Sequence, residues 1–392
     1  MKNLKRTLPA GWRWVKLGEV ISEAQAGFAC GKRDIEGIVQ LRMNNLDTRG
    51  NFVWDDVLRV PREGNVIEPF LLEPGDVLFN NTNSTELVGK SALFSGYSEP
   101  IVYSNHFTRL RTIDNRLNPV FLASWLNNQW QRGIFAGICN KWIGQSAVKA
   151  DKLLNLEIPL PPLPEQQRIA GILKEQMAAV DKARKAAQER LEAAKTLPDS
   201  FIWESLKSGK KSKRFLGDCL VEVRKGVGKD WGKYPVLGAT RNGLALAKEP
   251  VGKNPERYKL VDPVTVFYNP MRILLGSIAV VDYSDQAGIT SPDYVVIKGK
   301  EGILDTRWFY YWFRSSKGAH LIDSLSRGAV RERILFNRLS VGNIEIPDYE
   351  TQLHASRHMA YLNPIVEKIS NELNIINALP AALLRQAFNG EL

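Results

Sequence analysis

Cysteine and histidine are scarce in this chain of 392 residues, which contains three cysteines and four histidines. Cys30, Cys139 and Cys219 are widely separated and show no Cys-x-x-Cys spacing, so neither a disulfide framework nor a thiolate metal site is indicated. This usage fits a reducing compartment, and we expect a cytoplasmic protein. There is no run of about 18 uncharged apolar residues and no apolar signal segment, so we expect neither a membrane span nor secretion.

Complete catalytic motifs are also missing. Gly89-Lys90-Ser91 resembles the end of a phosphate-binding loop, but Ser84 stands where the first glycine of that loop must be. Asn269-Pro270 resembles the strand end of amino-methyltransferases, but Met271 follows in place of proline, and no Gly-x-Gly loop accompanies it. We therefore interpret both segments as structural.

Complete sets of metal ligands are missing from the sequence as well. Pro292-Asp293 could open a nuclease metal site, but no Asp/Glu-x-Lys follows it. His354 and His358 share one face of a helix, but no Glu follows His354 and no third zinc ligand is evident. We expect a solvent-facing histidine pair, and no catalytic residue, metal site or bound cofactor in this chain.

Acidic residues are outnumbered, with 42 Asp and Glu against 53 Lys and Arg, which leaves a net charge of +11. This balance suits a polyanionic partner such as nucleic acid, although charge alone fits equally a protein whose charge serves only solubility. A hydrophobic content of 44% with ten tryptophans excludes disorder. The length allows two or three folded domains.

The chain contains an internal repeat. Leu17-Gly18-Glu19 is echoed by Leu216-Gly217-Asp218, and LLEPGDVLFN, which ends at Asn80, is echoed by LVDPVTVFYN, which ends at Asn269. Further along, LEIP is echoed by IEIP and one Leu-Pro pair by another, always in the same order and with slowly shrinking offsets. Four ordered matches are hard to obtain by chance, so we infer a duplication with loops of different length.

Each copy begins with short apolar runs rich in Val, Ile, Phe and Tyr, which predict strands. These runs are DVLFN, KSALF and HFTRLRTI in the first copy and VTVFYN, SIAVVDY and YVVIKG in the second. Residues 118–129 and 305–316 are predicted to be short helices that begin near Asn118 and Asp305. We assign their aromatic residues to the core rather than to a base-stacking surface.

Each copy then changes to a long helical pattern, the first time after PLPPLPEQQ. Apolar residues recur there by threes and fours, which predicts a heptad seam. The predicted seam positions are Ile169, Ile172, Gln176, Val180, Ala183, Ala187, Leu191, Ala194, Leu197 and Phe201, followed in the second copy by Ile365, Ile369, Leu373, Ile376, Leu379 and Leu383. We expect two long helices, each roughly 60 Å for about 40 residues, that pair antiparallel and act as a spacer.

Prolines and a basic run modify this pattern. Pro198 and Pro380 are expected to kink the helices at matching places. Pro364, after an Asn363 cap, is expected to restart the second helix. The basic stretch at 207–214 is interpreted as a solvated linker between the two halves.

Together these patterns predict an α/β (α+β) protein. Two tandem globular modules, at residues 1–160 and 208–347, are expected to be separated by two helical spacers. The spacers, at residues 161–207 and 348–392, are expected to pair as an antiparallel coiled coil.

Three motifs make the whole chain resemble the specificity subunits of type I restriction-modification enzymes. They are GWRWVKLGEV at Gly11–Val20, PLPPLPEQQR at Pro159–Arg168 and AFNGEL at Ala387–Leu392. The second copy, at Ile346–Gln352, lacks the proline cluster of the first. The resemblance implies that each module is a target-recognition domain that reads one half of a split DNA sequence, while the helix pair fixes the gap.

The resemblance also implies the partners: double-stranded DNA, two methyltransferase subunits docked on the helical regions, and restriction subunits that translocate and cleave. S-adenosylmethionine, ATP and Mg would then lie on those subunits, and this chain would be non-catalytic. One alternative is a coiled-coil scaffold without sequence-specific DNA binding, although an antirestriction mimic should be acidic. The recognition part of a single-chain restriction enzyme is another, although it should carry catalytic motifs.

Candidate DNA contacts are polar and basic residues on loops that could enter a groove, because phosphate neutralisation needs Lys and Arg and base reading needs Arg, Asn or Gln. In the first module these are Asn80, Asn81, Asn83, Ser84, Lys90, Ser104, Asn105, His106, Lys141, Gln145, Ser146 and Lys149. In the second they are Arg241, Asn242, Tyr268, Asn269, Arg272, Thr290, Ser291, Arg327, Arg331 and Arg333. The arginines near the end of the second module are favoured most, with a merely solvated face as the alternative.

Overall fold

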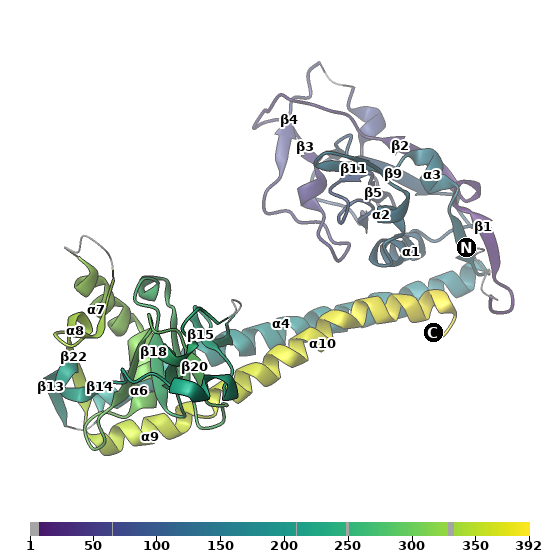
Figure 1. Ribbon diagram of the computed structural model, residues 1–392. Helices are drawn as coiled ribbons and strands as arrows, with labels where there is room; N and C mark the ends of the chain where they lie inside the picture. Colours follow the sequence, from purple (N-terminus) through teal and green to yellow (C-terminus); the bar gives the residue numbers. More distant parts are fainter. Residues whose placement is uncertain (1–7, 65, 209, 248–250, 328–332) are drawn as a thin grey trace. The chain divides into compact units, whose positions relative to one another are not determined.

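The computed structural model describes residues 8–64, 66–208, 210–247, 251–327 and 333–392 (Figure 1). Its contacts divide the chain into two units, one made of residues up to Lys185 together with Asn374–Leu392, and the other of Ala186–Leu373. Each unit contains one globular module and part of a helix pair. None of the described helices is long and apolar enough to cross a membrane.

The first module is built on a four-stranded antiparallel sheet in the order β2-β9-β5-β7, beside smaller sheets β4-β3-β8, β10-β11-β6 and β1-β12. The strands are β1 Arg13–Lys16, β2 Ile21–Ala26, β3 Ile38–Leu41, β4 Leu58–Val60, β5 Val77–Asn80, β6 Thr82–Asn83, β7 Ser91–Leu93, β8 Ile101–Tyr103, β9 Phe107–Thr112, β10 Asn140–Trp142, β11 Gln145–Ala147 and β12 Glu157–Leu160. The helices are α1 Pro119–Gln131, α2 Ile134–Ile138 and α3 Ala150–Leu154.

The second module has the corresponding central sheet β14-β21-β18-β19 and the pair β13-β22, with two-stranded sheets β15-β16 and β17-β20 in place of the three-stranded sheets of the first module. Its strands are β13 Lys211–Phe215, β14 Leu220–Glu222, β15 Leu237–Thr240, β16 Gly243–Leu246, β17 Lys259–Val261, β18 Thr265–Tyr268, β19 Ile278–Val281, β20 Gly288–Thr290, β21 Val295–Gly299 and β22 Asn343–Pro347. Its helices are α5 Leu216–Cys219, α6 Thr306–Arg314, α7 Ser316–Ser326 and α8 Phe336–Leu339.

The internal repeat is confirmed by the register of the two central sheets. Val77 faces Leu110 across β5 and β9, and Val266 faces Ile297 across β18 and β21, at corresponding places in the repeat. All six predicted strand segments contain a strand. The modules therefore share the order of their central sheet and differ in the smaller sheets and loops around it.

Helices α1 and α6 begin where the sequence predicts. The side chain of Asn118 accepts a hydrogen bond from the amide of Phe121 at 3.0 Å, and Asp305 accepts one from Trp308 at 2.8 Å. Such caps satisfy amides that have no partner inside the helix. The aromatic side chains of both helices are buried, except for Trp130, which is half-buried against the core cluster of the first module, so they belong to the core.

The long helices α4 (Leu163–Lys207) and α10 (Leu362–Asn389) run antiparallel, as predicted (Figure 1). In the first unit, Arg168 donates to the carbonyl of Leu392 at 2.7 Å and Arg184 donates to the side chain of Asn377 at 2.9 Å. The contacted residue of α10 thus lies earlier in the chain as α4 advances, as in an antiparallel pair. In the second unit, Arg190 pairs with Glu372 at 2.6 Å.

The helix ends also complete the module cores. Ile169 and Leu173 of α4 and Phe388 of α10 belong to the buried cluster of the first module. Ile202 and Leu206 of α4 belong to that of the second module. Each module is therefore packed on its own part of the helix pair, rather than being joined to it by a free tether.

The predicted seam is only partly correct. Val180, Ala187, Leu191 and Ala194 are among its buried members, whereas Leu197, Ile365 and Leu379 are 40%, 43% and 39% exposed. A straight α-helix drifts by about 20° per heptad from a repeat of 3.5 residues. Seam positions that are predicted from a constant heptad spacing therefore rotate away from the partner helix along its length.

Two boundary predictions need correction. Helix α9 (Tyr349–Met359) ends before α10 begins at Leu362, so a new helix does start near Pro364, but Asn363 lies inside that helix rather than at its cap. Pro364 falls in the first turn, where its missing amide costs no helical hydrogen bond. Part of the expected linker is the strand β13, whose side chains are exposed and whose backbone pairs with β22.

Candidate nucleic-acid interface

Three polar loops of the first module meet at the small sheet β10-β11-β6. Ser146 of β11 faces Asn83 of β6, and the amide of Val148 donates to the carbonyl of Asn81 at 2.9 Å. The Asn81 amide group also donates to the carbonyl of Asn105 at 3.2 Å. Loops that are far apart in the sequence therefore form one surface.

This surface presents a mixture of amides and lysines. Asn105, Lys141, Gln145 and Lys149 are exposed, and four more candidates are half-buried, namely Asn81, Asn83, Ser84 and His106. Amide side chains can read adenine edges and lysines can neutralise phosphates. The arrangement has the chemistry that a DNA groove requires.

Four candidates of the first module cannot contact a duplex in this structure, because they are buried: Asn80, Lys90, Ser104 and Ser146. Asn80 donates to the carbonyls of Thr82 and His106 at 3.0 and 2.9 Å. The ammonium of Lys90 donates to the carbonyl of Leu46, and burial lowers its pKa. Asn80 and Lys90 therefore hold the loops in place from beneath.

Gly89 shows the structural role of the segment that resembles a phosphate-binding loop. Its φ is +97°, and a Cβ atom there would lie 2.2 Å from the ring of Phe135. We expect Gly89→Ala to destabilise the first module by at least about 1–3 kcal/mol, since strained backbone and a clash combine. Urea unfolding followed by hydrogen exchange of β5 checks this, with Gly133→Ala as control. Gly133 shares the positive φ but has open space around its Cα. Equal losses in both variants would contradict a role for the contact with Phe135.

In the second module, Arg241 and Arg272 border one cavity of about 820 Å³. Arg241 and Asn242 form the exposed turn between β15 and β16, and Arg272 follows β18. Arg314 donates to the carbonyls of Arg241 and Ile278 at 2.6 and 2.8 Å, so it fixes the turn against the sheet. Two of the predicted arginines therefore lie at the border of the same cavity.

Two other candidates of the second module are buried, so the expected direct contact is not available to them. Tyr268 lies in the core, where burial raises the pKa of its hydroxyl, and Thr290 is fully buried in β20. Asn269 and Ser291 are half-buried. Asn269 accepts the amide of Met271 at 3.0 Å, so the Asn-Pro-Met segment forms a turn.

The arginines that the sequence favoured most lie near the end of the module. Arg327 is exposed and pairs with Asp323 at 2.6 Å, whereas Arg333 is half-buried with an unpartnered Nε. Arg331 lies outside the described residues. Exposed pairs of this kind are weak, so Arg327 can exchange Asp323 for a phosphate at little cost.

Within the described residues, no group of three or more His, Cys, Asp or Glu side chains could hold a metal ion. His354 and His358 are exposed on α9 with ring centroids 4.7 Å apart, as the sequence predicts for a solvent-facing pair. The ring of His358 also stacks on Phe201 at 5.7 Å.

Sequence reasoning missed two residues of the first surface. Trp142 and Ile143, at the tip of the β10–β11 hairpin, are 60% and 105% exposed. The signal was present, because two large apolar residues stand between Lys141 and Gly144, in a segment too short to bury them.

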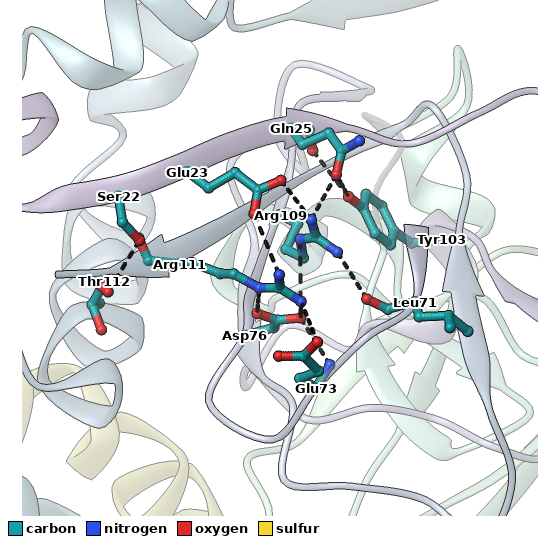
Figure 2. A network of polar contacts seen from close by, with 10 residues as sticks. All are labelled: Ser22, Glu23, Gln25, Leu71, Glu73, Asp76, Tyr103, Arg109, Arg111 and Thr112. Carbon is teal, nitrogen blue, oxygen red and sulfur yellow. Dashed lines mark hydrogen bonds and ion pairs between the residues drawn. The ribbon is translucent and has the colours of Figure 1, made fainter. Parts of the chain in front are cut away.

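A charged network in the first module joins β2 and β9 to Asp76, which directly precedes β5 (Figure 2). Arg111 donates to Asp76 through Nε at 2.7 Å and Nη2 at 3.2 Å, and this bond raises its pKa. Arg109 donates to Glu23 and Gln25, both at 2.6 Å. Arg109 and Asp76 are almost fully buried, so the network is a structural part of the sheet.

Comparison with known proteins relates the chain to one family. A model of the type I restriction modification DNA specificity domain matches residues 65–192. The putative type I restriction enzyme MjaX specificity subunit of Methanocaldococcus jannaschii is 23% identical over 425 residues, which cover 100% of this chain and 97% of that protein. The StySPI specificity subunit of Salmonella potsdam is 23% identical over 217 residues, 55% of this chain and 44% of that protein.

Solved structures share the whole fold. The HsdS subunit of Thermoanaerobacter tengcongensis superposes with a TM-score of 0.57 at 19% identity, covering 100% of both chains. A chain described in connection with complex assembly and conformational transition of the type I R-M system gives 0.66 at 19% identity, covering 99% of this chain and 100% of that one.

The chain has two modules with the same central sheet order, each packed on its part of an antiparallel helix pair. The chain is similar over its whole length to a type I restriction-modification specificity subunit, and its residues 65–192 match the DNA specificity domain of that family. Subunits of this class are non-catalytic, and the catalytic activities lie in their partner subunits.

Proposed function

We propose that each module reads one half of a bipartite DNA target. The observation that supports this most directly is that the modules share one sheet order while their loops differ. The first surface is rich in asparagine and lysine, such as Asn83 and Lys141, and the second presents Arg241 and Arg272. Equivalent scaffolds with unlike loops suit two unlike half-sites.

In this proposal the helix pair fixes the gap between the half-sites and docks two methyltransferase subunits. The support is that α4 and α10 retain exposed apolar side chains, among them Leu197, Trp203 and Ile375 at 40%, 52% and 66% exposure. A docked subunit would remove these apolar side chains from water, which favours binding. Restriction subunits would join the same complex in the cytoplasm, and S-adenosylmethionine, ATP and Mg would be held by the partners.

Selection from a randomised duplex library tests the proposal. The chain is purified with the methyltransferase encoded beside it, and retained DNA is sequenced at near-physiological salt. We expect two short unlike motifs at one fixed gap, because each module contributes its own contacts. Retention without sequence preference would leave only the coiled-coil scaffold and would contradict the proposal.

Variants then assign each motif to a module. Arg241→Ala with Arg272→Ala should relax one motif, and Asn83→Ala with Gln145→Ala the other, each by about 1–3 kcal/mol per lost base contact. Arg357→Ala, an exposed arginine on α9, is the matched control and should change neither motif. Relaxation of both motifs by either pair would contradict independent reading.

A further inference from the structure

The tip of the β10–β11 hairpin carries apolar side chains where a soluble surface usually has polar ones. Ile143 and Gly144 form its two-residue turn, and Gly144 has a φ of +77°, which favours glycine. Ile143 is fully exposed and Trp142 is 60% exposed. Single exposed apolar residues are common, but an adjacent pair at the end of a projecting hairpin is a feature that needs a partner.

The base of the hairpin is held firmly. Ser146, buried in β11, shares a hydrogen bond of 2.8 Å with Thr85, and β11 pairs with both β10 and β6. Lys152 donates to the carbonyl of Ile138 at 2.7 Å, just before β10 begins. The tip is therefore presented on an ordered support, so little conformational freedom remains to be lost on binding.

The surroundings of the tip indicate what the partner is made of. Lys141 of β10 and Lys149, two residues after β11, are both exposed. The amides of Asn81 and Asn83 are hydrogen-bonded inside the module, whereas the amide of Gln145 on β11 is exposed. A suitable partner has negatively charged groups that contact the lysines and hydrogen-bond acceptors that contact the amide. It also has flat apolar surfaces between which the tip can insert. Double-stranded DNA has both, in its phosphates and its stacked bases.

We propose that Ile143 inserts as a wedge at a base step of the half-site read by the first module, with Trp142 packed against the adjacent base. The inference rests on the proposed function and adds to it a way of reading sequence without hydrogen bonds. Apolar wedges of this kind unstack bases and kink the duplex. Pyrimidine–purine steps unstack most easily, so the first half-site should contain one.

Fluorescence of 2-aminopurine tests the wedge in the complete complex of this chain with its methyltransferase partner. The selected target is prepared with 2-aminopurine at the purine of each candidate step in turn. We expect a several-fold increase in fluorescence at one step when the wild-type complex binds, because unstacking removes quenching. Ile143→Ala should abolish the increase and weaken specific binding about 10-fold.

Ile35→Ala is the matched control, since Ile35 is an 87% exposed isoleucine of the same module outside the sheet β10-β11-β6. It should leave the fluorescence increase and the affinity unchanged. Trp142→Ala provides a second variant at the tip, and it should reduce the increase without changing the melting temperature, because the side chain has little buried contact to lose.

The outcomes separate the wedge from the proposed function. Tight specific binding with no fluorescence change at any purine of the half-site would overturn the wedge and leave bipartite reading intact. Loss of methyltransferase binding by Ile143→Ala without DNA present would overturn it too, because the tip would then be a protein contact. Absence of any sequence-specific binding by the wild-type complex would overturn both proposals.

Discussion

Asp76→Ala should destabilise the first module by about 3–5 kcal/mol, because it leaves the buried Arg109 and the half-buried Arg111 without their shared carboxylate. The Asp76 side chain is 2% exposed and accepts from Arg111 and from the amide of Glu73, while Arg109 Nε lies 4.0 Å away. Arg109 still reaches Glu23, but its own side chain is only 3% exposed and cannot be hydrated instead. Removal of one partner from such a network costs more than the network contributes overall.

Hydrogen exchange of the β5 and β9 amides measures this loss within one module, which a single unfolding curve of a two-module chain does not. Glu73→Ala is the control, because Glu73 is 69% exposed and contacts Arg111 only at the edge of the network. It should cost less than about 1 kcal/mol. The amides of β18 and β21 should be unaffected in both variants, and equal effects of the two substitutions would refute the argument.

The second module lacks this network, although it has the same sheet. By the register of the two sheets, Arg111 corresponds to Lys298 and Arg109 to Val296, which is buried in an apolar cluster. Lys298 pairs with Asp262 at 2.7 Å, but both side chains are partly exposed. Of the two arginine positions, one therefore keeps a charged side chain with a carboxylate partner, while the buried one is apolar in the second module.

The architecture could be predicted from the sequence because its signals are periodic and local. The strands around Asn80 and Asn269, the caps Asn118 and Asp305 and the antiparallel helices all follow from patterns within a few residues, or from their repetition. The pairing of β13 with β22 could not be predicted, because a strand made of exposed lysines and arginines has no alternation to reveal it.

The candidate interface was harder to predict, since loop residues do not show from the sequence which way they point. Asn80 and Lys90 have the side chains of DNA contacts, yet both are turned inward to satisfy backbone carbonyls. Burial of a loop creates such carbonyls, and polar side chains are the groups that pair with them. Conversely, Trp142 and Ile143 look like core residues by type, and only the hairpin geometry shows that they are exposed.

Two glutamines at corresponding places in the repeat have corresponding hydrogen-bond partners. Gln166 and Gln352, each fully buried near the start of the helix that follows its module, make the same three hydrogen bonds. The Oε1 of Gln166 accepts the amide of Asn118 at 2.8 Å, and its Nε2 donates to the carbonyls of Arg116 and Pro161, both at 2.9 Å.

Gln352 reproduces this pattern around the other module. It accepts the amide of Asp305 at 2.8 Å and donates to the carbonyls of Ile303 and Pro347 at 3.1 and 2.9 Å. The second copy keeps this glutamine although it has lost the proline cluster before it. The glutamine thus joins the cap of the module helix to the first turn of the following helix, and the prolines are not needed for that junction.

Gln166→Leu should therefore destabilise the junction of the first module by about 3 kcal/mol or more, because three buried backbone groups lose their partner while the side-chain volume is kept. Gln352→Leu should do the same in the second module. Hydrogen exchange should rise at residues 116–121 in the first variant and at 303–308 in the second, with the other junction unchanged. Gln167→Leu, an exposed neighbour, should alter neither. If the junction also sets how a module is held on its helix, either buried variant should accept targets with a wider range of gaps in library selection. An unchanged exchange profile in both variants would show that the hydrogen bonds contribute nothing to the junction.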